Sequence, residues 1–338
     1  MSESNRKFLR DIKIFLVCLF PQKRTAAILG YGGDVIGLNL DDYRFGVEVE
    51  FSNISRKQAA QALAQTLNGV AVEQGGAYRK WIVKDSQGRI WQVVYDSSVI
   101  ATNGGEQCEL VTPVLTYSAD MPILQECLRS LYRVGARVNE RCGCHTHVSK
   151  KAGQFDADTL VRLCKIIYSK QDLLYKALGV EDNSRRIDYC KKVNADFVRR
   201  LENKKPKSLQ AFADEYYLGY GGAAANANYH YSSSRYTAVN LHNLLSNSSK
   251  KTIEFRLFNS TLHAGLARTY IILSIAIVNQ AVCQRSARAT ITETDNPAFT
   301  LRTWLLRMGF IGDEFKNPRQ HLLNRFSAEG HSKAWRYR

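Results

Sequence analysis

Three short segments of the sequence carry reactive side chains at alternate positions. The three pairs are Glu48 and Glu50, His145 and His147, and Glu254 and Arg256. Successive side chains of a β-strand point to opposite faces, so the members of each pair share a face if their segments are strands. Carboxylates and imidazoles bind divalent metal ions, and arginine suits phosphate. The pairs therefore predict a site for divalent ions and a phosphate group.

The residues that alternate with these pairs are apolar or small. Val47 and Val49 alternate with the first pair, and Phe255 separates the members of the last pair. This pattern favours strands with one buried face, which we expect over 44–51, 138–149 and 252–258. Paired glutamates are also common on a solvated strand face, and Arg256 has an alternative as a structural ion-pair partner of the glutamates.

A zinc site is a further alternative, because two cysteines precede the histidines. Cys142, Cys144, His145 and His147 lie within six residues of one another. Alternation along a strand places the thiols and the imidazoles on opposite faces, so one ion cannot bind all four.

The other elements follow from apolar spacing and turn residues. Ser55 is expected to cap a helix that ends at Leu67. Two alternating segments, 79–84 and 89–95, predict a hairpin. Glu109 lies on a strand that Pro113 ends. Further helices are expected over 119–134, 156–178, 186–201, 207–217 and 263–287, and a further strand over 235–241.

Composition is that of a globular protein with an anionic partner. Apolar residues make up 45% of the 338 residues and charged residues 23%, and the net charge is +16. Such a charge favours a nucleotide, a nucleic acid, an acidic peptide or a membrane surface as partner. The apolar run 12–20 is too short to span a bilayer, so no membrane span is expected. Eight cysteines without a secretory signal favour free thiols and a cytoplasmic location.

The chain divides into three regions on these patterns. Residues 1–39 read as an N-terminal extension that ends in a glycine-rich stretch, and 290–338 as a basic C-terminal tail. Residues 40–289 form the expected catalytic domain. Within it, 181–235 is polar and tyrosine-rich, which predicts a lid or substrate-binding insertion.

Six motifs in order resemble the amidoligase family, related to glutamine synthetase and glutamate–cysteine ligase. They are Phe-Gly-Val-Glu-Val-Glu-Phe, Asp-Ser-Ser, Glu-Leu-Val-Thr-Pro, Cys-Gly-Cys-His-Thr-His-Val, Arg-Tyr followed by Asn-Leu, and Thr-Ile-Glu-Phe-Arg-Leu-Phe-Asn-Ser-Thr-Leu. The resemblance covers about residues 44–285. It implies an α+β fold, with a curved antiparallel sheet (a half-barrel) of the glutamine synthetase catalytic-domain type and helices on its outer face.

The resemblance also implies a reaction. ATP phosphorylates a carboxylate, and an amine attacks the acyl phosphate to form an amide, with Mg²⁺ or Mn²⁺ on the concave face. The substrates are a carboxylate and an amine from an amino acid, peptide or protein. An oligomer, and contact of the basic tail with a polyanion, are compatible with this interpretation.

Residue roles are carried over by motif. Glu48, Glu50, Glu109 and Glu254 are implied metal ligands, as is His147 or else His145. Arg256 is implied to hold the transferring phosphoryl group, with Arg235 as a second phosphate-binding arginine and Asn240 as a cofactor-binding residue. Asp96 is implied to accept a proton from, or orient, the amine. The sequence departs from the family at Thr146 and Ser260, neither of which is a proposed ligand.

Two other classes of function remain as alternatives. The net charge allows a nucleic-acid-binding protein on a degenerate ligase scaffold. The glutamate and histidine cluster allows a metal-dependent amide hydrolase. Asp96-Ser97-Ser98 has the simpler interpretation of a turn with local hydrogen bonds.

Overall fold

A computed structural model of the chain describes residues 35–180, 188–219, 227–229 and 232–327. Its described part contains one open sheet of eight antiparallel strands, in the order β2-β3-β4-β5-β1-β6-β8-β7. The predicted α+β class with an antiparallel sheet is confirmed. The half-barrel of glutamine synthetase type stays an expectation.

The centre of the sheet is formed by the strands that carry the reactive pairs. β1 (Tyr43–Phe51) lies between β5 (Cys108–Val111) and β6 (Gly143–Lys150), and β8 (Ile253–Asn259) follows β6. A bulge between Cys144 and Thr146 shifts the pairing of β6 with β8. The three strands predicted around the pairs are confirmed, although β6 begins five residues later than predicted.

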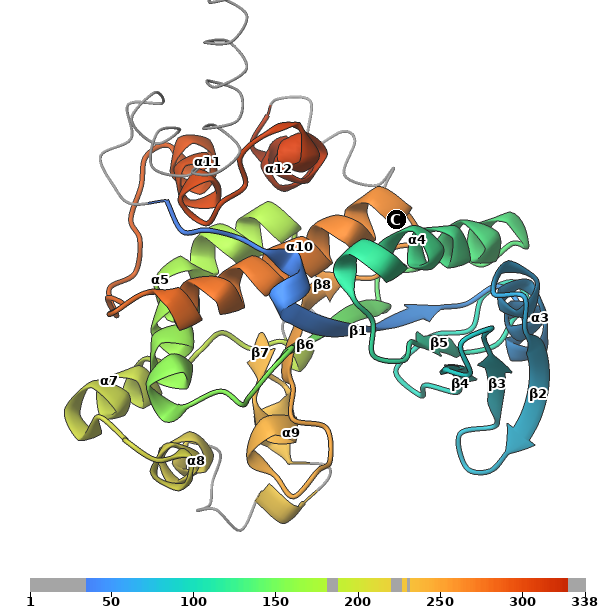
Figure 1. The fold of residues 1–338 in the computed structure, drawn as a ribbon, viewed down its shortest axis with the longest axis horizontal. Helices are drawn as coiled ribbons and strands as arrows, with labels where there is room; N and C mark the ends of the chain where they lie inside the picture. The colour runs from blue at the N-terminus through green and yellow to red at the C-terminus, as the bar shows by residue number, and fades with distance from the viewer. Residues whose placement is uncertain (1–34, 181–187, 220–226, 230–231, 328–338) are drawn as a thin grey trace, which may run out of the picture.

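The apolar face of these strands packs on long helices that lie on one side of the sheet (Figure 1). These are α4 (Tyr117–Arg133), α5 (Ala157–Leu178) and α10 (Ala264–Cys283). Val49 and Phe51 of β1 are fully buried in the same core as Ile275 of α10. Burial of large apolar side chains stabilises this arrangement by roughly 1.5–3 kcal/mol each.

Helix α10 is largely apolar, with a few polar side chains that contact neighbouring elements, such as Arg268 and Gln280. It is long and apolar enough to cross a membrane by length and composition, but 78% of its most apolar window is buried inside the protein. A core helix has these properties, since a helix that packs on all sides needs no polar face.

One end of the sheet carries the predicted hairpin and an edge strand that was not predicted. β3 (Lys80–Lys84) and β4 (Ile90–Val94) form the hairpin, and β2 (Val70–Gly75) is the edge. Helix α3 (Arg56–Thr66) starts at Ser55, whose hydroxyl accepts from the amide of Gln58 in a capping box. This cap was predicted.

The opposite end corrects two sequence predictions. The helical pieces predicted over 186–201 are confirmed only in part: residues 188–189 are helical, 190–194 are not, and α7 (Ala195–Lys204) begins where Asn194 caps it. The strand predicted over 235–241 is only β7 (Val239–Asn240), and Arg235 lies in the 3₁₀ turn η3 (Ser233–Arg235). Helices α8 (Leu209–Leu218) and α9 (His242–Leu245) complete this end. Residues 181–187, 220–226 and 230–231 of the predicted insertion lie outside the described residues.

The C-terminal region folds onto the domain. α11 (Pro297–Arg307) and α12 (Lys316–Leu323) pack near α10, and the Trp304 indole donates to Gln280 Oε1 at 2.9 Å. The short 3₁₀ turns are η1 (Leu40–Asp42), η4 (Asp313–Phe315) and η5 (Asn324–Phe326). The region described from sequence as a basic tail thus contains helices, whereas the division of the chain into domains stays a prediction, and most of 1–39 lies outside the described residues.

Candidate active site

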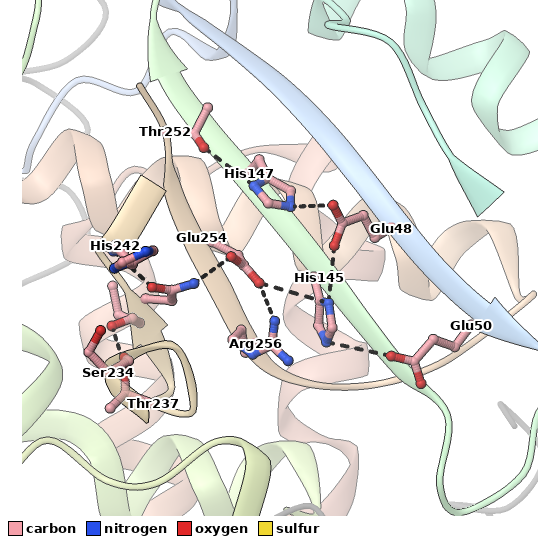
Figure 2. A network of polar contacts seen from close by, with 12 residues as sticks. Glu48, Glu50, His145, His147, Ser234, Thr237, His242, Thr252, Glu254 and Arg256 are labelled. Atoms are coloured by element: carbon pink, nitrogen blue, oxygen red, sulfur yellow. Dashed lines mark hydrogen bonds and ion pairs between the residues drawn. The ribbon is translucent and has the colours of Figure 1, made fainter. Parts of the chain in front are cut away.

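The register of the central strands brings the three reactive pairs to one surface (Figure 2). Glu48 lies opposite His145, Glu50 lies opposite Glu109, and His147 lies opposite Glu254. These opposed positions place groups from distant parts of the sequence within a few ångströms of one another. This convergence is the geometry that the spacing predicted.

His145 lies at the middle of the cluster. Its Nδ1 atom is 3.3 Å from Glu48 Oε2 and 3.9 Å from Glu254 Oε1, and its Nε2 atom is 3.8 Å from Glu50 Oε1. The side chain is 5% exposed. A buried imidazole surrounded by three carboxylates is a common surrounding for a metal-binding histidine.

His147 lies at the edge of the cluster. Its Nε2 atom is 3.2 Å from Glu48 Oε1, and its Nδ1 atom is 3.4 Å from the Thr252 hydroxyl. The Nε2 atoms of both histidines are buried without an aligned hydrogen bond in the described chain. Buried polar nitrogens normally have partners, so these two atoms fit a cation or a ligand.

Glu254 is held in place by two neighbours. Asn240 Nδ2 donates to Glu254 Oε2 at 2.7 Å, and Arg256 forms a salt bridge with the other carboxylate oxygen. The Asn240 carbonyl oxygen accepts from the backbone amide of His242 at 2.8 Å. Both ends of the Asn240 amide are thus engaged, which makes it a positioning residue for Glu254, and its predicted contact with a cofactor stays a prediction.

Glu50 is fixed from both its side chain and its backbone. The backbone amide of Gly143 donates to Glu50 Oε2 at 2.7 Å, and the Ser260 hydroxyl donates to the Glu50 carbonyl oxygen at 2.6 Å. Ser260 is one of the two positions at which the sequence departs from the pattern that it resembles. Its hydroxyl therefore supports the strand that carries Glu50.

Two sets of side chains have the composition and spacing of metal-binding groups. One contains Glu48, His145 and Glu254, and the other Glu50, Glu109 and His145, with ligand atoms within 4.8 Å of one another. Neither set contains a cysteine. In the described part of the chain, Cys144 is buried in the apolar core, which is consistent with the exclusion of one zinc ion bound by both thiols and imidazoles.

The carboxylates of the cluster repel one another in the absence of a cation. Burial raises the pKa of Glu109 well above its ordinary value, and the charges of Glu48 and Glu50 raise it further. Burial also lowers the pKa of His145 to about 4, with the Arg256 charge as the next cause. His145 therefore has a free nitrogen lone pair at neutral pH, whereas the surroundings of Glu109 favour its protonated form until a cation offsets the neighbouring charges.

The pKa of His147, at the edge of the cluster, shifts in the opposite direction to that of His145. Burial lowers the pKa of His147, but the nearby charge of the Glu48 carboxylate raises it above its ordinary value overall. Burial raises the pKa of Glu48, but His147 and His145 hold it well below the usual range. Glu48 and His147 therefore each stabilise the charged form of the other in the protein without bound metal.

Two cavities open beside Glu48 and His147. One has a volume of about 470 Å³ and is walled in part by Pro113, Phe155 and Leu244. The other has a volume of about 650 Å³ and a polar lining from amide, hydroxyl and charged side chains, namely Asn228, Arg235, Asn243, Ser246, Asn247 and Ser248. Arg235 thus lies in a cavity wall next to the cluster, although it is not on a strand.

Asp96 lies outside the contact network of the cluster. Its carboxylate accepts from the backbone amide of Ser98 at 2.6 Å, as in a local turn, while its charge contributes to the raised pKa of Glu109. The structure therefore places Asp96 near the cluster, and its predicted role with the amine stays a prediction.

Comparison with known families agrees with this geometry. Residues 41–278 match a family model described as "Putative amidoligase enzyme". The chain belongs to the amidoligase family. The matched region contains every strand of the sheet and every residue of the cluster. A search of curated proteins gave no match.

Sequence reasoning missed four residues of this amidoligase site. Thr252 and Gly143 contact the cluster through one hydrogen bond each, Ser260 supports Glu50, and Lys250 borders both cavities. Thr252 is the first residue of the strand predicted over 252–258, and Lys250 lies two residues before it, which was the one signal available in the sequence. The contacts of Gly143 and Ser260 depend on how the strands pair, so no local pattern in the sequence marks these two residues.

Proposed function

We propose that this amidoligase is an ATP-dependent ligase that joins a carboxylate to an amine through an acyl phosphate, with Mg²⁺ or Mn²⁺ as cofactor. The observation that carries the proposal is the convergence of four glutamates, two histidines and Arg256 on one surface of the sheet. Phosphoryl transfer depends on positioning and charge neutralisation, which such a surface supplies once cations are bound.

The donor set fits divalent metal ions, as the buried imidazole nitrogens and the repelling carboxylates indicate. Glu48, His145 and Glu254 would hold one ion, and Glu50 with Glu109 a second. A neutral imidazole has one nitrogen lone pair, so His145 can serve only one of the two groups. When bound, the ions would offset phosphate charge and polarise the transferring phosphoryl group.

The nucleotide is proposed to lie on the His147 side of the cluster. His147 borders both cavities, whereas His145 is enclosed by carboxylates, so we assign His145 to metal and His147 to the nucleotide. The apolar walls of the smaller cavity suit a purine ring. Arg256 and Arg235 would contact phosphate oxygens, for which the guanidinium fork is well shaped.

The proposed reaction has two steps. A substrate carboxylate oxygen attacks the γ-phosphorus of ATP, the bond to the bridging oxygen breaks, and ADP leaves. The amine then attacks the acyl carbon, the carbon–oxygen bond to phosphate breaks, and an amide forms. An ammonium substrate loses two protons, the first to Asp96 or to water and the second to the departing phosphate. Arg256 would hold the phosphoryl group in both steps.

The direct test measures ADP release from ATP and Mg²⁺ with panels of carboxylates and amines. Glu48→Gln and Glu254→Gln should each lower the rate by about 100-fold or more, because each removes a carboxylate ligand of the ion that would neutralise and position the phosphates. Glu73→Gln is the matched control, since Glu73 is exposed on the edge strand. Full activity of the Glu254→Gln protein would overturn the proposal.

Two outcomes would favour another function. Amide cleavage with metal but without nucleotide would indicate the metal-dependent hydrolase. The second alternative is nucleic-acid binding, which the net charge of +16 favours. Binding of RNA or DNA that weakens steeply with salt, without ADP release for any substrate pair, would indicate that alternative.

A further inference from the structure

One lysine connects the two cavities. Three residues line both of them, namely Glu48, His147 and Lys250. Glu48 and His147 already belong to the cluster described above. Lys250 is therefore the one residue of these three to which the proposed reaction assigns no role.

The surroundings of Lys250 differ from those of the next residue, Lys251. Lys251 Nζ donates to the carbonyl oxygens of Leu244 at 3.3 Å and Ser246 at 2.6 Å, at the C-terminal end of α9. A cation there satisfies helix carbonyls and stabilises the helix end. Lys251 also lines the smaller cavity, but these carbonyl oxygens hold its ammonium group, so we assign it a structural role.

Lys250 has no such role. It is exposed, and in the described part of the chain its ammonium forms neither a hydrogen bond nor an ion pair, while its backbone amide donates to the Ser248 hydroxyl at 3.1 Å. Its charge nevertheless acts on His147, for which it opposes protonation. The loop therefore presents a cation to the cluster.

The charge of the proposed complex requires further cations on this side. A nucleoside triphosphate brings about four negative charges. Glu48 and Glu254 line the polar cavity and repel them, while Arg256 is paired with Glu254. An unpaired ammonium at the junction of the cavities is well placed to offset part of this charge.

We infer that Lys250 contacts the β- or γ-phosphate of the bound nucleotide at the junction of the two cavities, and that Lys251 does not. This inference rests on the proposed ATP-dependent function. It adds a phosphate-binding residue outside the strands that carry the other ligands.

The test compares Lys250→Gln with Lys251→Gln in the full-length protein. Equilibrium binding is measured for ATP and AMP, each with Mg²⁺, together with the thermal unfolding midpoint. Lys250→Gln should weaken ATP binding about tenfold, as expected for one charged hydrogen bond, and leave AMP binding and the midpoint unchanged. Lys250→Arg should restore most of the ATP affinity. Lys251→Gln should lower the midpoint without changing ATP affinity.

The outcomes separate this inference from the function on which it rests. Unchanged ATP affinity in Lys250→Gln would overturn the role of Lys250 while leaving ATP dependence intact. Equal loss of ATP and AMP affinity would also overturn it, because the contact would then not be with the phosphates that AMP lacks. No ATP binding by the wild-type protein would instead overturn the proposed function.

Discussion

At the scale of the residue, Glu109 shows how a charged group of the site lowers the stability of the metal-free fold. Its pKa is raised by burial and by neighbouring carboxylates, so the ionised form is unfavourable in the folded protein without metal. A carboxyl group with a raised folded-state pKa destabilises the fold once pH exceeds the unfolded-state pKa. Glutamine has a similar shape and no charge.

We therefore predict that Glu109→Gln stabilises the metal-free protein at pH 8 by about 1 kcal/mol or more, while it lowers ligase activity. The gain should disappear as pH falls below the ordinary glutamate pKa of 4.5, where both states are protonated. Urea unfolding at a series of pH values in the presence of a chelator measures this. A variant less stable than wild type at pH 8 would contradict the prediction.

Ser260 is the second residue with a specific expectation. Its hydroxyl donates to the carbonyl oxygen of Glu50, a buried contact. Ser260→Ala should lower the free energy of unfolding by about 1 kcal/mol, the usual net value of one such bond. Ser286→Ala, at an exposed position, is the control. Equal unfolding midpoints in urea for the two variants would show that the bond contributes nothing.

Prediction from sequence succeeded best at this scale where reactive side chains alternate with apolar ones along a strand. The glutamate and histidine pairs reach one surface because each pair has a buried apolar partner face. The choice between the two imidazoles did not follow from the sequence. It depends on the bulge between Cys144 and Thr146 and on which neighbours surround each ring, and both are properties of strand pairing.

At the scale of the element, the hairpin of β3 and β4 is organised by one buried acid. Asp85 accepts from the Trp91 indole at 3.0 Å and from Arg89 Nε at 2.8 Å, and Arg89 reaches Asp120 on α4. Burial raises the pKa of Asp85, but these hydrogen bonds hold it below the ordinary value overall. The network ties the hairpin to the helix layer.

Asp85→Ala should destabilise the protein by about 3 kcal/mol, since it leaves buried donors without an acceptor. In the wild type this contribution is present above the unfolded-state pKa of Asp85, near 3.8, and is lost as pH falls through the lower folded-state pKa. Thermal unfolding between pH 2 and 7 measures both effects. Asp295→Ala, at an exposed site, should behave as wild type.

Local patterns predicted the long elements and failed for the short ones. β2 was missed because its apolar residues face solvent, with Val70 69% exposed, so no buried face marks the strand. The strand predicted through Arg235 fails for a tertiary reason. The Tyr216 hydroxyl donates to the carbonyl oxygen of Ser234 at 2.9 Å, and this bond from α8 holds the chain in a turn.

At the scale of the whole molecule, the proposed ligands should stabilise the fold. A ligand that binds only the folded state at 100 times its Kd adds about 2.7 kcal/mol to the free energy of unfolding. Mg²⁺ with a non-hydrolysable ATP analogue should therefore raise the thermal midpoint of the wild type. The increase should be absent in Glu254→Gln, and a variant that keeps the full increase would place the nucleotide elsewhere.

The pairing of β1 with β6 has one last consequence, for how this protein can change. The glutamates alternate with Val47 and Val49, which are buried in the core, so sliding β1 by one position would bury the acids and expose the valines. The same strand register thus sets both the burial of the core and the position of the glutamates, so a change of register would alter both at once. The cavity loops, such as the one that carries Lys250, lie outside the paired strands and are free of this register constraint.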